Sequence, residues 1–213
     1  NALFAGAPFS SEPLTLLDTH QTFPEAMMSP TGDQLAYRST DTASGAQQIV
    51  VIDRNLNERR VIEGAETIWA FAFAGPDQLV GATDEGLQVI DLQTGTSRQV
   101  PLAAPAQSIW AVSPDGTRVL VGAINAMVLA DLTTGETSVL PDVANYAWVL
   151  PEFPSITEDR IVADGSQTAS PRLAIVDLLA DPIAGAVEYV DSSVTTHVLD
   201  SLTSDAAAVI VEA

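Results

Sequence analysis

The chain of 213 residues contains no cysteine and no lysine. The absence of cysteine excludes disulfides, thiol nucleophiles and cysteine-bound zinc. The absence of lysine excludes Schiff-base chemistry and the phosphate-binding lysine of a P-loop. The sequence also lacks a Gly-x-Ser-x-Gly nucleophile elbow and a glycine-rich loop for dinucleotides. Several large classes of enzyme are therefore excluded.

Positive charge is scarce, because eight arginines stand against 28 acidic residues and leave a net charge of -20. A charge of this sign repels phosphate backbones and anionic membrane surfaces, so we expect no nucleic-acid partner. No apolar run approaches the roughly 18 residues of a membrane-spanning helix, so we expect no membrane span. The acidic residues either form an ordinary solvated surface or attract cations and basic partners.

One motif recurs along the chain as a turn followed by an apolar strand. Its clearest copies occupy residues 29–37 and 113–121, where the turn begins with Ser-Pro, and a third copy occupies residues 75–80. Weaker copies lie at residues 157–162 and 203–211. The matched apolar positions are spaced by roughly 40–48 residues: Leu35, Leu79, Val119, Ile161 and Val209.

A second motif lies about half a period away and is an apolar strand that ends in aspartate, at Asp53, Asp91, Asp131 and Asp177. In two copies, residues 91–95 and 131–135, the aspartate opens a turn that reaches glycine four residues on. Aspartate can bond the backbone two residues ahead, and glycine supplies a positive φ. With a strand before and after, each period predicts four strands, which is typical of a propeller blade. A β-sandwich lacks this ordered alternation of two turn types.

We therefore predict an all-β chain that forms a single domain over residues 1–213, a β-propeller of about five four-stranded blades. The fifth repeat stops after its second strand, near Glu212, and residues 2–5 and 14–17 read as the third and fourth strands that would close this last blade. Closure would remove exposed sheet edges. The alternative is a fragment of a larger propeller. Residues 197–211 also fit an amphipathic helix, but the repeat register favours strands there.

Residues 113–135, and next residues 29–53, resemble the WD40-like repeats called PD40 of the TolB propeller. They are also similar to the propellers of YVTN-type surface proteins and of prolyl-oligopeptidase-type peptidases. The resemblance implies a propeller fold, an extracytoplasmic location (periplasmic, secreted or cell-surface) and contacts with other proteins. It says little about activity, because the proline, aspartate and glycine of the motif form a turn.

Propellers bind ligands at the mouth of the central channel, on the loops that lead from one blade into the next. Here those loops contain both histidines, His20 and His197, and nearby acids that include Asp18 and Asp142. Neutral imidazoles and carboxylates are usual ligands of divalent cations, so these four residues are the candidate metal ligands. Otherwise no cofactor is expected. The alternative is two ordinary loop histidines on an acidic protein.

Three tryptophans fall near the same rim: Trp69, Trp110 and Trp148. An aromatic rim could stack on a sugar or hold a peptide, so these residues are the candidate ligand-binding residues. The alternative is that their rings pack between neighbouring blades, where large flat side chains fill wedge-shaped gaps.

The sequence favours a non-enzymatic scaffold that binds a protein partner or a small ligand at the channel mouth, with no catalytic residue assigned. A rigid disc with variable loops suits such a role. One alternative is a metal-dependent, lactonase-like hydrolase that uses the channel-mouth histidines and acids. Another is the propeller domain of a longer peptidase or surface protein.

Overall fold

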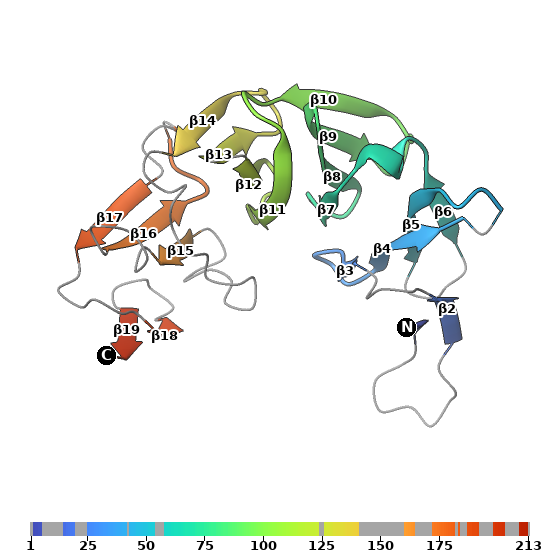
Figure 1. Cartoon of the computed structure of the whole chain (residues 1–213), viewed down its shortest axis with the longest axis horizontal. Coiled ribbons are helices and arrows are strands. Elements are labelled where there is room, and N and C mark those ends of the chain that lie inside the picture. Colours follow the sequence, from blue (N-terminus) through green and yellow to red (C-terminus); the bar gives the residue numbers. More distant parts are fainter. Residues whose placement is uncertain are drawn as a thin grey trace. The chain divides into compact units, whose positions relative to one another are not determined.

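The computed structural model is built almost wholly from β-strands (Figure 1). Among the residues it describes, helical structure is limited to the 3-10 conformation, in the short turn η1 (Ala65–Thr67) and at Ile183. The described residues are 2–5, 15–19, 25–41, 43–53, 58–123, 126–140, 160–164, 172–181, 183, 187–191, 198–202 and 209–212.

Three antiparallel sheets of four strands follow one another along the chain, and in each sheet every strand pairs with the next. The first contains β3 (Ala26–Met28), β4 (Gln34–Thr40), β5 (Gln47–Asp53) and β6 (Arg59–Ile62). The second contains β7 (Ala70–Phe73), β8 (Gln78–Thr83), β9 (Gly86–Asp91) and β10 (Ser97–Pro101). The third contains β11 (Ala106–Val112), β12 (Arg118–Ala123), β13 (Ala126–Asp131) and β14 (Thr137–Leu140). The predicted four-stranded unit is confirmed.

The remaining strands form smaller sheets. A three-stranded sheet contains β15 (Arg160–Asp164), β16 (Arg172–Asp177) and β17 (Val187–Asp191). Two antiparallel pairs contain β1 (Ala2–Ala5) with β2 (Thr15–Thr19), and β18 (Val198–Leu202) with β19 (Val209–Glu212). The second pair agrees with the strand interpretation of residues 197–211. The number of blades and the closure of the last one by β1 and β2 stay predictions.

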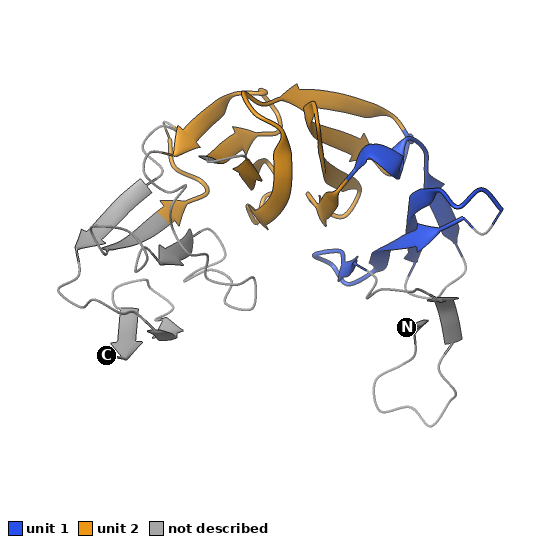
Figure 2. Cartoon of the chain, viewed as in Figure 1, with its two compact units in different colours: residues 1–68, 93–95 blue, residues 69–92, 96–213 orange. Residues whose placement is uncertain are grey.

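The chain divides into two compact units (Figure 2). The first unit consists of residues 1–68 and 93–95, and the second of residues 69–92 and 96–213. The first unit holds the sheet β3–β6, and the second holds the sheets β7–β10 and β11–β14. The assignment of residues 1–213 to one domain stays a prediction.

In the first unit, a small core forms around Tyr37, Val50 and Ile52, and the half-buried Leu35 packs against it. Four successive residues of β5, from Ile49 to Ile52, are buried. Because neighbouring side chains of a strand point to opposite faces, this run means that both faces of β5 are covered.

In the second unit, the sheet β11–β14 is buried on both of its faces. The side chains of Val119, Leu120 and Val121 on β12 all have an exposed fraction of 0%. Val119 and Val121 belong to a core shared with the sheet β7–β10, which includes Val80 and Val89. Leu120 belongs to a second core. A sheet of a β-sandwich keeps one face toward solvent, so this packing matches a stack of repeated sheets instead.

The second core is shared with residues that follow the third sheet along the chain. Leu120 packs there with Leu129 from β13, with Val176 from β16, and with Leu178 from the turn after β16. The sheet β11–β14 therefore lies between two neighbouring sheets. The continuous apolar runs of β12 and β13 follow from this position.

The Ser-Pro turn of the third sheet shows why its sequence is so specific. The N–H of Ser113 donates to the carbonyl of Arg118 at 2.9 Å, and the N–H of Gly116 donates to the carbonyl of Ser113 at 2.8 Å. Gly116 has a φ of 70°, and a Cβ at this position would lie 2.6 Å from the carbonyl oxygen of Ala74. Only glycine fits both the backbone conformation and the close approach.

Candidate functional site

The sheets of the second unit have two ends, which are described separately for the residues that the structure describes. At one end, which we call the turn end, lie residues 74–77, 113–117 and 132–136 together with Leu92. Backbone bonds tie these turns together, because the N–H of Leu92 donates to the carbonyl of Asp77 at 2.8 Å and the N–H of Leu132 donates to that of Thr117 at 2.6 Å. The opposite end, which we call the loop end, carries Trp69 and residues 83–86 and 101–105.

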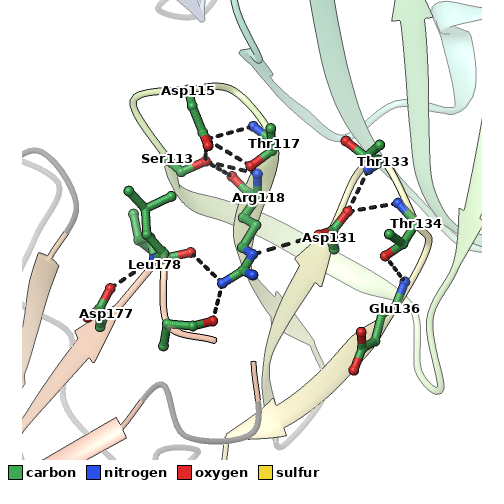
Figure 3. Close-up of polar contacts among 12 residues, drawn as sticks. Ser113, Asp115, Thr117, Arg118, Asp131, Thr133, Thr134, Glu136, Asp177 and Leu178 are labelled. Atoms are coloured by element: carbon green, nitrogen blue, oxygen red, sulfur yellow. Dashed lines mark hydrogen bonds and ion pairs between the residues drawn. The ribbon is translucent and has the colours of Figure 1, made fainter. Parts of the chain in front are cut away.

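At the turn end, Asp131 accepts bonds from backbone groups of its own turn (Figure 3). Its Oδ1 lies 2.8 Å from the N–H nitrogens of both Thr133 and Thr134. Partial burial opposes ionisation of Asp131, but the bonds from Thr134 and Thr133, with help from the nearby Arg118, lower its pKa below the usual value. This carboxylate is therefore ionised, and its hydrogen bonds stabilise the turn.

Asp115 plays the same part in the Ser-Pro turn. The hydroxyl of Ser113 donates to its Oδ1 at 2.6 Å, and Thr117 donates from its N–H at 3.0 Å and from its hydroxyl at 2.8 Å. The Ser113 bond is the main cause of a lowered pKa for Asp115, which burial opposes and the bonds from Thr117 reinforce. A general acid needs a raised pKa, so neither aspartate suits that role.

Three described arginines use their side chains to bond other groups of the same chain. In the first unit, Arg38 pairs with Glu25 at 2.9 Å and donates to the carbonyl of Ile68 at 2.9 Å. In the second unit, Arg98 donates to the carbonyl of Leu132. Arg118 donates to two carbonyls and faces Asp131. These guanidinium groups therefore have structural roles, because they bond carbonyls and carboxylates of the same chain.

The loop end presents a tryptophan and two carboxylates. Trp69 immediately precedes β7, its backbone N–H donates to the carbonyl of Ala82 at 2.9 Å, and 52% of the residue is exposed. The neighbouring hairpin joins β8 to β9, and its tip consists of the exposed Asp84 and Glu85. The backbone of Trp69 is therefore hydrogen-bonded to β8, the strand that leads into this acidic tip.

A buried threonine fixes the shape of that hairpin. The hydroxyl of Thr83 donates to the carbonyl of Gly86 at 3.2 Å and accepts from the N–H of Glu85 at 3.3 Å. Gly86 has a φ of 124°, and a Cβ there would lie 2.6 Å from the carbonyl oxygen of Val100. The acidic tip is therefore held against β10 by local bonds and close packing.

Trp110, another predicted ligand-binding residue, lies in β11 and is half-buried. It packs against the core that contains Leu120 and Leu129. A Cβ on Gly122 would lie 2.5 Å from its Nε1, so the indole covers this glycine closely. The position agrees with the packing alternative, and ligand binding by Trp110 stays a prediction.

Most of the other predicted site residues lie outside the part of the chain that the structure describes. Trp148, His20, His197 and Asp142 lie outside the described residues. Asp18 lies in β2 with Leu3 as its register partner, and only its backbone is described. Within the described part of the chain, no three histidine or acidic residues gather as metal ligands would. The metal site stays a prediction.

Sequence reasoning missed the acidic hairpin tip at Asp84 and Glu85. The available signal was a two-residue connection followed by glycine between two apolar strands, which is typical of a tight hairpin. It also missed the roles of Arg98 and Arg118, whose acceptors are backbone carbonyls 34 and 60 residues away.

Comparisons with solved structures identify the fold. The chain is similar to the β-propeller domain of Cps50 (Swd1) from Myceliophteria thermophila, with a TM-score of 0.51, 21% identity, and coverage of 82% of this chain and 57% of that one. It is similar to TolB from Agrobacterium tumefaciens, with a TM-score of 0.53, 15% identity, and coverage of 88% and 73%. It is also similar to the N-terminal domain of Nup159, with a TM-score of 0.51, 17% identity, and coverage of 76% and 42%.

These likenesses and the stacked four-stranded sheets confirm the predicted β-propeller fold. No family model matches the chain, and no curated protein matches it in sequence. The chain spans 57% of the Swd1 propeller domain and 42% of the Nup159 domain. Another similar structure holds Nup159 bound to Dbp5 of S. cerevisiae. Among the described residues, no helix is long and apolar enough to cross a membrane.

Proposed function

We propose that the chain is a non-enzymatic propeller that binds a protein partner at the loop end of its sheets, through Trp69 and the hairpin tip of Asp84 and Glu85. The observation that carries this proposal is the 52% exposure of Trp69 next to a strand with an acidic tip. Tryptophan is among the residues that contribute most to protein–protein interfaces. Nup159, which shares the fold, is bound to Dbp5, so propellers of this kind do bind proteins.

The partner in this proposal carries basic residues at the contact. The whole chain has a net charge of -20, and both arginines described in atomic detail in the second unit, Arg98 and Arg118, donate to carbonyls of that unit. The loop end therefore offers carboxylates together with an aromatic face. Arginine or lysine of a partner can pair with the first and stack on the second.

A variant of the loop end tests this function. Cross-linking in the source organism first identifies a partner, which is then purified and titrated against the wild-type chain. The variant Trp69→Ala/Asp84→Asn/Glu85→Gln should weaken the Kd at least about 30-fold, because a tryptophan hot spot contributes about 2 kcal/mol or more. The matched control Asp77→Asn/Glu136→Gln removes the same two charges at the turn end and should leave the Kd within about threefold. Equal weakening by both variants, or by neither, would overturn the proposal.

The proposal includes a location outside the cytoplasm, which rests on the TolB-like resemblance. Fractionation of the source cells should recover the chain in the periplasmic, secreted or cell-surface fraction. Recovery in the cytoplasm would contradict this location. The reading frame on both sides of residues 1–213 tests the remaining alternative, in which the propeller is one domain of a longer peptidase or surface protein.

A further inference from the structure

Two arginines of the second unit bond the same kind of carbonyl in the sheet that follows their own. Arg98 extends from β10 and donates to the carbonyl of Leu132. Arg118 extends from β12 and donates to the carbonyl of Leu178 at 3.4 Å, and also to that of Ala180 (Figure 3). Leu132 directly follows Asp131, and Leu178 directly follows Asp177, so the two leucines occupy equivalent places in the repeat.

The same leucines also fill the space between sheets. Leu132 is 1% exposed and packs in the core shared with the sheet β7–β10, which carries Arg98. Leu178 is 1% exposed and packs with Leu120 of the sheet β11–β14, which carries Arg118. Each leucine thus packs its side chain against the preceding sheet. An arginine of that preceding sheet in turn donates a hydrogen bond to the backbone carbonyl of the leucine.

The two arginines come from different positions of the repeat. Arg98 lies on the fourth strand of its sheet, opposite Val89. Arg118 lies at the start of the second strand, opposite Asp131. At the first position the third sheet has Ser138, and at the second position the second sheet has Gln78. Each of these sheets therefore has arginine at one of the two positions and a shorter or neutral side chain at the other.

The register shows which residues hold the same two positions in the sheets that come before and after these two along the chain. In the sheet β3–β6 the two positions hold Arg60 and Gln34. In the sheet β15–β17 they hold Glu188 and Arg160. Each of these four sheets thus has arginine at one of the two positions, although the first sheet also carries Arg38 and Arg59 and the fourth also carries Arg172. Arg60 is exposed.

We infer that Arg98 and Arg118 are clasps supplied from two interchangeable positions of the repeat, each of which docks its own sheet onto the turn leucine of the next sheet. A buried carbonyl without a donor destabilises the fold, and a guanidinium group is a permanently charged donor with several N–H groups. The two positions are interchangeable because Arg98 and Arg118 each reach the carbonyl of the equivalent leucine in the next sheet. Asp131, whose Oδ2 lies 3.7 Å from Nε of Arg118, balances the charge of that clasp.

Moving the arginine between its two positions tests the clasp. The variant Arg98→Gln should lower the Tm by about 2–6 °C, since it removes a charge-assisted hydrogen bond. Adding Gln78→Arg should restore at least half of this loss. The control Arg98→Gln/Gln99→Arg returns the same charge to the same strand on its opposite face and should not restore the Tm. An unchanged Tm for Arg98→Gln, rescue by Gln99→Arg, or no rescue by Gln78→Arg would overturn the inference.

The reciprocal exchange provides a second test in the third sheet. Arg118→Gln removes bonds to two carbonyls and leaves Asp131 facing no cation, so its loss of Tm should exceed that of Arg98→Gln. Adding Ser138→Arg should restore part of the Tm. If Arg118→Gln alone does not fold, recovery of folded protein in the double variant supports the clasp. Failure of both variants to fold overturns the interchange of positions.

Discussion

The Nε of Arg118 lies 3.7 Å from Oδ2 of Asp131, and the two residues are register partners across β12 and β13. The same register pairs Gln78 with Asp91, Gln34 with Asp53 and Arg160 with Asp177. The aspartate at this register position is therefore a structural position of the repeat. The carboxylates of Asp53, Asp131 and Asp177 accept bonds from N–H groups of the turns that follow, which explains why a motif so regular in sequence predicts the fold but no activity.

Removing the carboxylate of Asp131 should destabilise the chain. Asp131→Ala deprives the N–H groups of Thr133 and Thr134 of their acceptor, and we expect a loss of about 1–2 kcal/mol in the free energy of unfolding. Urea unfolding measures it. Glu136→Gln, an exposed change in the same turn, should stay within about 0.5 kcal/mol and serves as the control. Equal losses in both variants would count against the structural role of Asp131.

Acid should remove the stabilisation that Asp115 provides. Because the fold lowers the pKa of Asp115, its carboxyl group binds fewer protons on average in the folded state than in the unfolded state near pH 4. The stabilisation is complete above the usual carboxyl pKa and disappears as the pH falls below it. Asp115→Asn should therefore be less stable than the wild type at pH 7, and the difference should shrink progressively as the pH falls below about 4. Urea unfolding over this pH range measures it, and a difference that does not change with pH would contradict it.

Alanine at Gly116 should be far less tolerated than alanine at Gly135. Both glycines have positive φ, but a Cβ at Gly135 meets nothing within 4 Å, whereas one at Gly116 lies 2.6 Å from the carbonyl oxygen of Ala74. We expect Gly135→Ala to cost about 1 kcal/mol from backbone strain. Gly116→Ala should cost about 1–3 kcal/mol more, because the sheet must move away. Thermal unfolding compares them, and equal costs would mean that the contact with Ala74 is absent.

A non-enzymatic scaffold should also lack a stoichiometric metal. We expect elemental analysis of the purified chain to find less than about 0.1 equivalent of zinc, calcium or manganese, and added cations to leave the Tm unchanged at fixed ionic strength. One equivalent of metal would instead favour the hydrolase alternative. In that case, loss of the metal in His20→Ala/His197→Ala would place it at the predicted ligands.

Much of the fold could be predicted because its signals are local in sequence. The Ser-Pro and Asp-x-x-x-Gly turns use bonds between residues that are two to five positions apart, such as those of Ser113 with Arg118 and of Asp131 with Thr133. The apolar runs of β12 and β13 follow from burial on both faces. Local chemistry and a regular period were therefore enough for the four-stranded unit.

The site was harder to predict because its determinants are not local. The clasps of Arg98 and Arg118 end on main-chain carbonyls, which carry no side-chain signature in the sequence. Trp69 and Trp110 both lie near the start or within the first strand of a sheet, yet one is 52% exposed and the other packs over Gly122. The two residues also differ in register, because Trp69 precedes β7 whereas Trp110 lies inside β11, so the tryptophans of the sequence do not mark one repeated site.

Native-state hydrogen exchange of the third sheet tests most directly whether the chain is a stack of sheets covered on both faces. The amides of Val119, Leu120 and Val121 should exchange only through global unfolding, with the same denaturant dependence as the whole chain. The amide of Val139, on the outer strand β14 with 55% of the residue exposed, should exchange at least about tenfold faster. Exchange of the β12 amides as fast as that of Val139 would contradict the stacked arrangement on which the loop end and the clasps depend.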